Sequence, residues 1–290
     1  MDIFLKAPAV DAYVPDGGNL PEALASTTDL AIGAHQDDIE IMSAAGIVAA
    51  FGSSERRFSA VVCTGGYGFS PRSGHYCDRS AEEITAIRHS EQRAAAAVGR
   101  YSAMIQLLNT SEQARDPKLQ SNLIDDIAEI VRLSQPDRVY THVLADKHET
   151  HIGVSVAVVR AMQALTPDER PAQLFGCEVW RSLDWVNDDE KVHLDSAGYD
   201  ALSSALIGVF DSQISGGKRY DLAAVGRRHA NATFGAPRAV DESDQITFAV
   251  DMTELMNSDV DLADWMAAYI RRFEDSVRTS LGQYCNGGQA

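Results

Sequence analysis

Four apolar stretches in the first half of the chain are each followed by a segment with helical spacing. The apolar stretches cover residues 29–34, 58–64, 103–108 and 138–143. The helical segments cover about residues 38–51, 80–98, 119–133 and 153–164. This alternation is typical of parallel strands joined by crossover helices that pack on both faces of one sheet. The pattern therefore predicts a three-layer α/β/α fold with a mostly parallel sheet.

The rest of the chain is less regular. We expect further strands at residues 174–180 and 244–251, and helices at 197–210, 220–229 and 261–280. Residues 1–28 contain Pro8, Pro15 and Pro21 and show little periodicity. They predict an irregular N-terminal arm that packs on the body or on a neighbouring subunit. With no internal repeat or linker, residues 29–290 are predicted to form a single domain with an elaborated C-terminal third.

Composition limits the classes of partner and compartment. Of the 290 residues, 45% are hydrophobic and 23% are charged, which is ordinary for a soluble globular protein. A net charge of −17 argues against binding to nucleic acid or to an anionic membrane. No run of about 18 apolar residues and no signal-like N-terminus is present, so we expect a cytoplasmic protein. The arm and the C-terminal helices offer surfaces for a homo-oligomer.

Histidines and carboxylates gather directly after two of the predicted strands. The first group is His35, Asp37 and Asp38, and the second is Asp146, His148 and His151. In an open parallel sheet, ligands bind beyond the carboxyl ends of the strands where the strand order reverses, so both groups can face one crevice. Two histidines and one carboxylate around a metal, with positions left for water, form a catalytic arrangement. None of the four cysteines lies in a C-x-x-C pair, so a cysteine-based zinc site is not expected.

Other prominent residues have plainer interpretations. The stretch Gly65–Arg79 is rich in glycine and aromatic residues and is predicted to be a loop that covers the substrate, with Tyr67 and Arg72 as contacts. We interpret His142 as a strand residue packed below the site. Trp180 is expected to be structural.

Three motifs resemble those of the PIG-L (LmbE-like) N-deacetylases. Ala34–Glu40 reads A-H-Q-D-D-I-E and resembles the family signature A-H-P-D-D-x-E, with Gln36 in the position of the proline. His148–His151 reads H-E-T-H and resembles the second signature, H-P-D-H. Arg88–Glu91 resembles the R-x-x-E helix between them. The three occur in the family's order, and the resemblance covers roughly residues 29–185.

The resemblance implies a Rossmann-like fold and a zinc-dependent hydrolase that removes acetyl groups from N-acetylglucosamine-type substrates. Carried over by position, the Zn²⁺ ligands would be His35, Asp38 and His151. Asp37 would be the general base acting on the metal-bound water. His148 would donate to the oxyanion or to the leaving amine, and Arg88 would contact the substrate or the carboxylates of the pocket.

The chemistry of amide hydrolysis agrees with these roles. Zinc lowers the pKa of its bound water towards about 7 and polarises a carbonyl group, and the leaving nitrogen must be protonated. Thr150 stands where the family has an aspartate that can pair with the histidine two positions earlier. Either Asp146 or Glu149 substitutes for that aspartate, or His148 is less basic.

Several alternatives stay open at this point. Two imidazoles and a carboxylate also suit Fe²⁺, Co²⁺ or Mn²⁺. The enzyme could be an amidase that cleaves a larger acyl group from an amino-sugar conjugate. The chain could also be a sugar-binding protein that kept the fold and lost turnover.

Overall fold

A computed structural model of the chain describes residues 3–68, 71, 73–235, 237–257 and 259–285. Its strands are β1 (Asp11–Tyr13), β2 (Asp29–Gly33), β3 (Phe58–Thr64), β4 (Met104–Asn109), β5 (Arg138–His142), β6 (Gln173–Cys177), β7 (Val192–Asp195) and β8 (Ile246–Asp251). Its α-helices are α1 (Leu20–Ala25), α2 (Asp38–Met42), α3 (Ala44–Phe51), α4 (Ala81–Val98), α5 (Ser111–Arg115), α6 (Ser121–Ser134), α7 (Glu149–Ala164), α8 (Asp200–Gly208), α9 (Asp211–Ile214), α10 (Tyr220–Phe234) and α11 (Leu262–Cys285).

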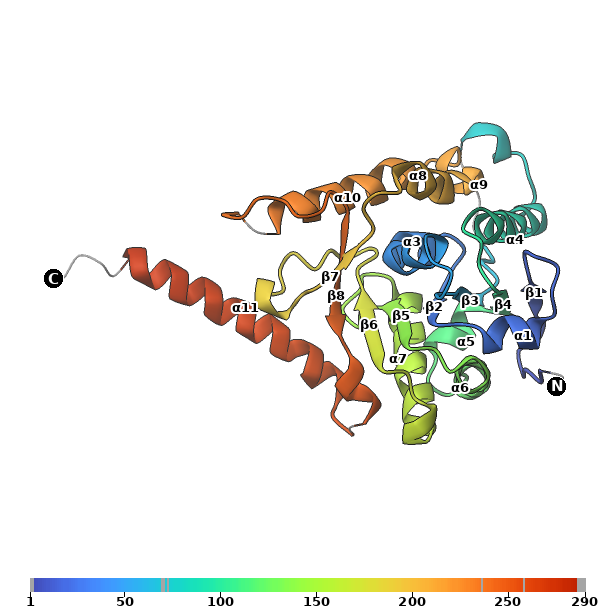
Figure 1. Cartoon of the computed structure of the whole chain (residues 1–290), viewed down its shortest axis with the longest axis horizontal. Coiled ribbons are helices and arrows are strands. Elements are labelled where there is room, and N and C mark those ends of the chain that lie inside the picture. The colour runs from blue at the N-terminus through green and yellow to red at the C-terminus, as the bar shows by residue number, and fades with distance from the viewer. Residues whose placement is uncertain (1–2, 69–70, 72, 236, 258, 286–290) are drawn as a thin grey trace.

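The strands form one sheet between two layers of helices, as predicted. Helices α3, α4, α8 and α10 lie on one side of the sheet, and α1, α6 and α7 lie on the other (Figure 1). The strand order in the described chain is β1-β4-β3-β2-β5-β6-β8-β7. The central strands β4, β3, β2, β5 and β6 are parallel, while β1, β8 and β7 pair antiparallel with their neighbours.

The strand order reverses between β2 and β5, at the centre of the sheet. From β2 the chain moves through β3 to β4 at one side, and then returns to add β5 and β6 at the other side. Helices that cross to opposite faces leave a crevice at such a point, beyond the carboxyl ends of the two strands. The segments after β2 and β5 therefore meet there.

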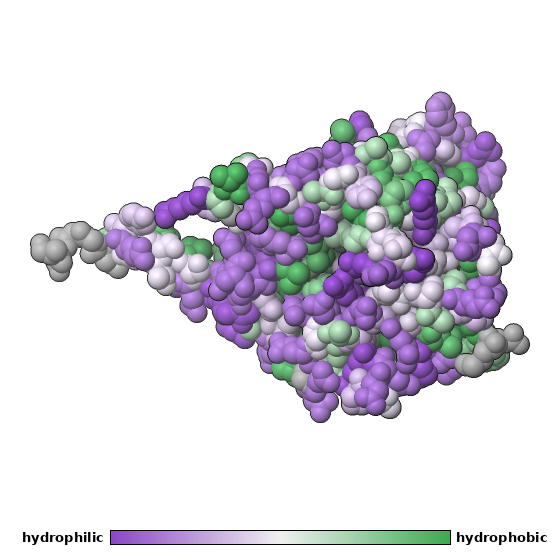
Figure 2. Space-filling view, in the orientation of Figure 1, coloured by the Kyte–Doolittle hydropathy of each residue, from purple (hydrophilic) through white to green (hydrophobic). Residues whose placement is uncertain are grey.

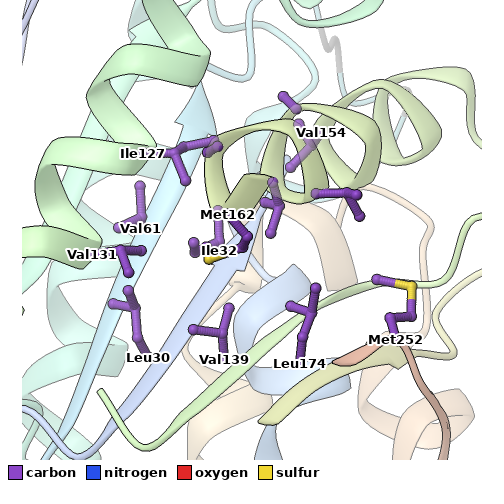
Figure 3. Packing of buried hydrophobic residues seen from close by; sticks show 14 of the residues in the cluster. Leu30, Ile32, Val61, Ile127, Val131, Val139, Val154, Met162, Leu174 and Met252 are labelled. Atoms are coloured by element: carbon purple, nitrogen blue, oxygen red, sulfur yellow. The ribbon is translucent and has the colours of Figure 1, made fainter. Parts of the chain in front are cut away.

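Two apolar clusters hold the layers together, because alternate residues of a strand face opposite sides of the sheet. On β2, Leu30 and Ile32 belong to the cluster under α6 and α7, and Ala31 belongs to the cluster on the other side. Figure 3 shows strand residues such as Val61 and Val139 packed against helix residues such as Ile127, Val131 and Met162. The buried sheet fixes the ends of β2 and β5 relative to one another.

Several elements differ from the sequence prediction. Residues 1–28, expected to be irregular, include the short elements β1 and α1, and β1 pairs with the edge strand β4. The helix expected over residues 38–51 is divided at Ser43, whose hydroxyl donates to the Ile39 carbonyl at 2.5 Å. A side chain that bonds the preceding turn in this way bends a helix.

Two further differences affect the crevice. Helix α7 begins at Glu149 rather than near Gly153, which places His151 in its first turn. Strand β6 ends at Cys177, before the predicted end at residue 180. The ladder stops there because the carboxylate of Glu178 accepts hydrogen bonds from the backbone N–H groups of Leu183 and Phe248. The chain therefore leaves the sheet before Trp180.

The C-terminal helix α11 extends away from the body of the molecule (Figure 1). The face seen in Figure 2 is mostly hydrophilic, with separate hydrophobic patches on the body. Within the described residues, no helix combines the length and the apolar character needed to cross a membrane.

Candidate metal centre and active site

The turn after β2 points two adjacent carboxylates in different directions. Asp37 has a φ of 93°, a left-handed conformation that costs free energy for a residue with a side chain. It lies directly before α2, and its N–H donates to Oε1 of Gln92 at 3.2 Å. Asp38 is the first residue of α2, and its Oδ2 accepts from the N–H of His35 at 2.7 Å. Strain of this kind is commonly retained where it orients functional groups.

Three side-chain atoms from the two groups form a nearly equilateral triangle. Nδ1 of His35 lies 3.2 Å from Nε2 of His151, and both nitrogens lie near Oδ2 of Asp38, at 3.4 and 3.3 Å. Ligand atoms 2.0–2.1 Å from a tetrahedral zinc ion are about 3.3–3.4 Å apart. The triangle therefore has the dimensions of one face of a zinc coordination sphere. The structure thus brings together the three residues expected as ligands.

Another histidine, His142, lies beside this triangle. Its Nε2 is 3.4 Å from Oδ2 of Asp38, so geometry alone also groups these two residues with His151. However, Nε2 of His142 accepts the N–H of Ala34 at 2.9 Å, which occupies its lone pair. Its ring stacks on that of His151, with the centroids 3.9 Å apart. This arrangement matches the interpretation of His142 as a residue packed below the site.

The tautomer of His151 is suited to metal binding. Its Nδ1 faces Oδ2 of Asp146 at 3.6 Å, and the Asp146 carboxylate is fixed by the N–H groups of His148 and Trp180 at 3.0 and 3.1 Å. A proton on Nδ1 leaves the lone pair of Nε2 directed at the triangle, as in carboxylate–histidine–metal arrangements. Burial lowers the pKa of His151 to about 4, so the ring is neutral at neutral pH, as a ligand must be.

The two neighbouring carboxyl groups have pKa values displaced in opposite directions. Burial, and then the charge of Asp38, raises the pKa of Asp37 well above its usual range, although the Arg88 guanidinium opposes this rise. Burial also acts on Asp38, but the rings of His151 and His142 outweigh it and hold the pKa of Asp38 well below its usual range. Such a separation is characteristic of a proton-transferring group beside a group that stays ionised.

No carboxylate of the described residues holds the side chain of His148. Asp146 is directed at His151, and the exposed Glu149 pairs with Arg115 at 2.9 Å. Instead, Nδ1 of His148 accepts the N–H of Thr150 at 3.3 Å. Burial and the neighbouring His35 lower the pKa of His148. Of the two outcomes left open by the sequence, the structure therefore favours a less basic His148, with its proton on Nε2.

Arg88 lies in the wall of the cleft and is 6% exposed. Its guanidinium donates to the carbonyl oxygens of Gly66 and Gln36 at 3.1 and 3.3 Å. In the amide orientation that satisfies both groups, Oε1 of Gln213 accepts from Nε of Arg88 at 2.8 Å. Arg88 thus ties the loop after β3 and helix α9 to the turn that carries Asp37.

The cleft above the triangle has a volume of about 290 Å³. Gly66, Tyr67 and Gly68 line it, so the start of the predicted covering loop lies where expected. The Tyr67 hydroxyl donates to the Leu108 carbonyl at 3.2 Å. Arg72, the other expected contact in this loop, lies outside the described residues.

Part of the cleft wall consists of residues that were not predicted to line it. Trp180, expected to be structural, is 37% exposed and lines the cleft together with Lys218 and Tyr220. Nζ of Lys218 lies 4.8 Å from the centre of the Trp180 ring. Lys218 and Tyr220 lie in no motif, and the start of α10 brings them to the cleft, whereas the early end of β6 brings Trp180 there.

Comparison with known proteins agrees with this architecture. Residues 30–162 match the family model of PIG-L, described as GlcNAc-PI de-N-acetylase. No curated protein matches the chain. The structure of 4-carboxy-2-hydroxymuconate hydratase from Pseudomonas putida KT2440 is similar, with a TM-score of 0.61 and 16% identity over 78% of this chain and 96% of the hydratase.

Two deacetylase structures are also similar. N,N'-diacetylchitobiose deacetylase from Pyrococcus horikoshii gives a TM-score of 0.58 and 15% identity over 85% of this chain and 92% of that enzyme. A triple mutant of a deacetylase from the teicoplanin biosynthetic pathway gives a TM-score of 0.54 and 14% identity over 78% of this chain and 97% of that enzyme. At these identities the similarities establish a shared fold.

The family model covers both signature motifs, Ala34–Glu40 and His148–His151, as well as the connecting R-x-x-E helix. Over residues 30–162, the sequence therefore matches the PIG-L family model.

Proposed function

We propose that this protein is a metal-dependent hydrolase that removes an N-acetyl group from an N-acetylglucosamine-type sugar or conjugate. The observation that carries the proposal is the triangle formed by Nδ1 of His35, Oδ2 of Asp38 and Nε2 of His151, with sides of 3.2–3.4 Å. The family match supports the reaction. The fold alone does not select it, because a hydratase and deacetylases share the fold.

The triangle fits a divalent cation, because its three atoms are the donors that zinc prefers and are separated as a tetrahedral ion requires. His35, Asp38 and His151 would hold the ion, with Zn²⁺ as the first choice and Fe²⁺ or Co²⁺ as substitutes. When bound, zinc supplies Lewis acidity that activates water and polarises a carbonyl group.

The protein's own residues supply the proton transfers and the binding. Asp37 shares the cleft with the triangle, and its raised pKa suits a group that takes a proton from water and later releases it. Neutral His148 can donate its Nε2–H to the oxyanion that develops on the substrate. Arg88, Tyr67 and Arg72 are the proposed substrate contacts, and the polar cleft suits the hydroxyl groups of a sugar.

Metal analysis and product release test this proposal together. Purified protein should contain about one equivalent of zinc, and His35→Ala should lose it, because one of three ligands is removed. His229→Ala is the control, since His229 is an exposed residue bonded to the Asp244 carbonyl. Acetate release from N-acetylglucosamine conjugates should accompany the zinc.

The Asp37→Ala variant tests the role of Asp37 as general base independently of metal binding. The variant should retain zinc and lose at least about a hundredfold in turnover, the usual scale for a general base. Wild-type turnover in this variant would refute the role of Asp37. Stoichiometric zinc without hydrolysis of any amide would favour a sugar-binding protein instead, and a protein that binds no divalent metal at neutral pH would refute the whole proposal.

A further inference from the structure

A second cavity, of about 140 Å³, adjoins the cleft on the side of α2 and α10. Its walls include Ile41, Val179, Ala223 and Ala224, which are all apolar. It shares Asp37, Asp38, Trp180 and Tyr220 with the cleft, so these four residues form the junction between the two spaces. We name this space the side pocket.

The cleft and the side pocket differ in chemical character. The cleft presents Arg88, Ser111, Gln213 and Lys218, which can bond to hydroxyl groups. Apart from the four residues that it shares with the cleft, the side pocket is lined by the four aliphatic side chains and by Arg227, whose Nη1 donates to the Val179 carbonyl. Sugar hydroxyl groups placed in the side pocket would lose hydrogen bonds to water with few replacements, which is unfavourable.

An N-acyl amino sugar likewise has a polar half and an apolar half. Its amine half is the polar sugar, its acyl half is apolar, and the bond to be cleaved lies between them. Asp37 and Asp38 lie at the junction of the two spaces. A substrate with its sugar in the cleft therefore directs its acyl group into the side pocket.

The volume of the side pocket exceeds what an acetyl group fills. A dry cavity of about 150 Å³ in another protein binds benzene, which has six carbon atoms. An acetyl group would place only one methyl group in a space of similar size. We propose that the side pocket is an acyl-binding site that accepts linear acyl chains of about four to six carbon atoms, so that the substrates are longer N-acyl amino sugars as well as N-acetyl ones. This inference rests on the proposed amide hydrolysis.

Chain-length preference tests the inference. The zinc-loaded protein is assayed for release of glucosamine from N-acetyl-, N-butanoyl- and N-hexanoylglucosamine. We expect kcat/KM for the butanoyl substrate to equal or exceed that for the acetyl substrate, because each buried methylene can strengthen binding up to about fourfold. A decrease of more than about tenfold from acetyl to butanoyl would overturn the inference while leaving the proposed function intact. No hydrolysis of any of the three would overturn both.

A variant that fills the side pocket tests whether the chain-length preference arises there. Ala224→Phe should lower kcat/KM for the butanoyl and hexanoyl substrates more than about tenfold and change the acetyl value less than about threefold. Leu222→Phe is the matched control, because Leu222 lies on the same helix, is 61% exposed and is not part of the side pocket. An equal loss on all three substrates in Ala224→Phe would assign the side pocket to the sugar rather than to the acyl chain.

Binding provides a readout that does not need turnover. In calorimetry with the Asp37→Ala variant, N-hexanoylglucosamine should bind more tightly than N-acetylglucosamine, and adding Ala224→Phe should abolish the difference. If Ala224→Phe does not fold, Ala223→Phe replaces it, since Ala223 lies at the exposed edge of the side pocket and tolerates a larger residue more easily. Equal binding of the two ligands would contradict an acyl-binding site.

Discussion

Glu40 is a buried acid whose protonation should govern how the stability of the protein depends on pH. It is 1% exposed, and its Oε1 accepts from the Tyr101 hydroxyl at 2.8 Å and from Nε2 of Gln92 at 2.9 Å. Its Oε2 has no hydrogen-bond partner among the described residues. Burial raises the pKa of Glu40 from 4.5 to about 8. The folded protein therefore keeps this carboxyl group neutral at pH 7, whereas the unfolded chain ionises it.

The sign of the effect follows from the raised pKa. Below pH 4.5 both states are protonated and the stabilising contribution is complete, and it is lost as the pH rises through about 8. Between pH 5 and pH 9, linkage with these two values gives a loss of about 4 kcal/mol in the free energy of unfolding. Glu40→Gln cannot ionise, yet its amide oxygen can still accept from Tyr101 and Gln92. The variant should therefore gain about 4 kcal/mol relative to the wild type over this interval.

Urea unfolding followed by circular dichroism from pH 5 to pH 9, with a chelator present, measures the difference. Glu55→Gln, which changes an exposed carboxylate, is the control and should give a curve parallel to the wild type. An equally parallel curve for Glu40→Gln would contradict the prediction, because it would mean that Glu40 is ionised in the folded protein throughout this pH range. Pairing with the buried Arg228, whose Nη2 donates to the Glu40 carbonyl at 2.5 Å, would be the physical reason.

Three further substitutions test the supports of the site. Asp146→Asn should weaken zinc affinity about 10- to 100-fold in competition with a chelator, because the group that orients His151 loses its charge; unchanged affinity would exclude this orienting role. Gly66→Ala should destabilise the protein by about 1–3 kcal/mol more than Gly68→Ala in thermal unfolding, since both glycines have positive φ, but only at Gly66 would a Cβ collide with Oε1 of Gln36. Thr150→Asp should raise the pKa of His148 in NMR titration of the metal-free protein, because it adds a negative charge beside the ring; an unchanged pKa would show that the two side chains do not interact.

The sequence predicted that His35, Asp38 and His151 lie together because their placement depends on local features. The two motifs that contain histidine ligands come after the buried strands β2 and β5, and the parallel order of these strands is sufficient to bring His35 and His151 to one edge of the sheet. The three-layer fold was predictable for the same reason, from the alternation of apolar strands and amphipathic helices.

The far wall of the cleft depends on packing between distant segments. Gln213 reaches Arg88 only because helix α9 packs on α4, where Ser212 donates through its N–H and hydroxyl to Glu91 at 2.7 and 2.6 Å. Trp180 reaches the cleft because the Glu178 carboxylate ends β6 early. Neither contact leaves a periodic pattern in the sequence, so neither could be predicted from it.

The two departures from the family motifs have different physical consequences. Gln36, in place of proline, is fully buried, and its Nε2 donates to Oε1 of Gln106 at 3.0 Å, which anchors the turn in another way. Thr150, in place of aspartate, offers His148 no carboxylate, and only a backbone N–H bonds to its Nδ1. The triangle of His35, Asp38 and His151 therefore retains its support, whereas under the proposed function the supply of a proton to the leaving group would change.

If His148 is neutral at the working pH, it can stabilise an oxyanion but holds no spare proton for the leaving nitrogen. Asp37 is the group in the cleft whose raised pKa allows it to keep a proton taken from water and then deliver it. Under the proposed function, one carboxyl group would thus act first as base and then as acid. Replacing Asp37 should then remove both steps, whereas replacing His148 should remove only oxyanion stabilisation, about 10²- to 10³-fold in kcat. A loss in His148→Ala as large as that in Asp37→Ala, with zinc retained, would return the acid role to His148.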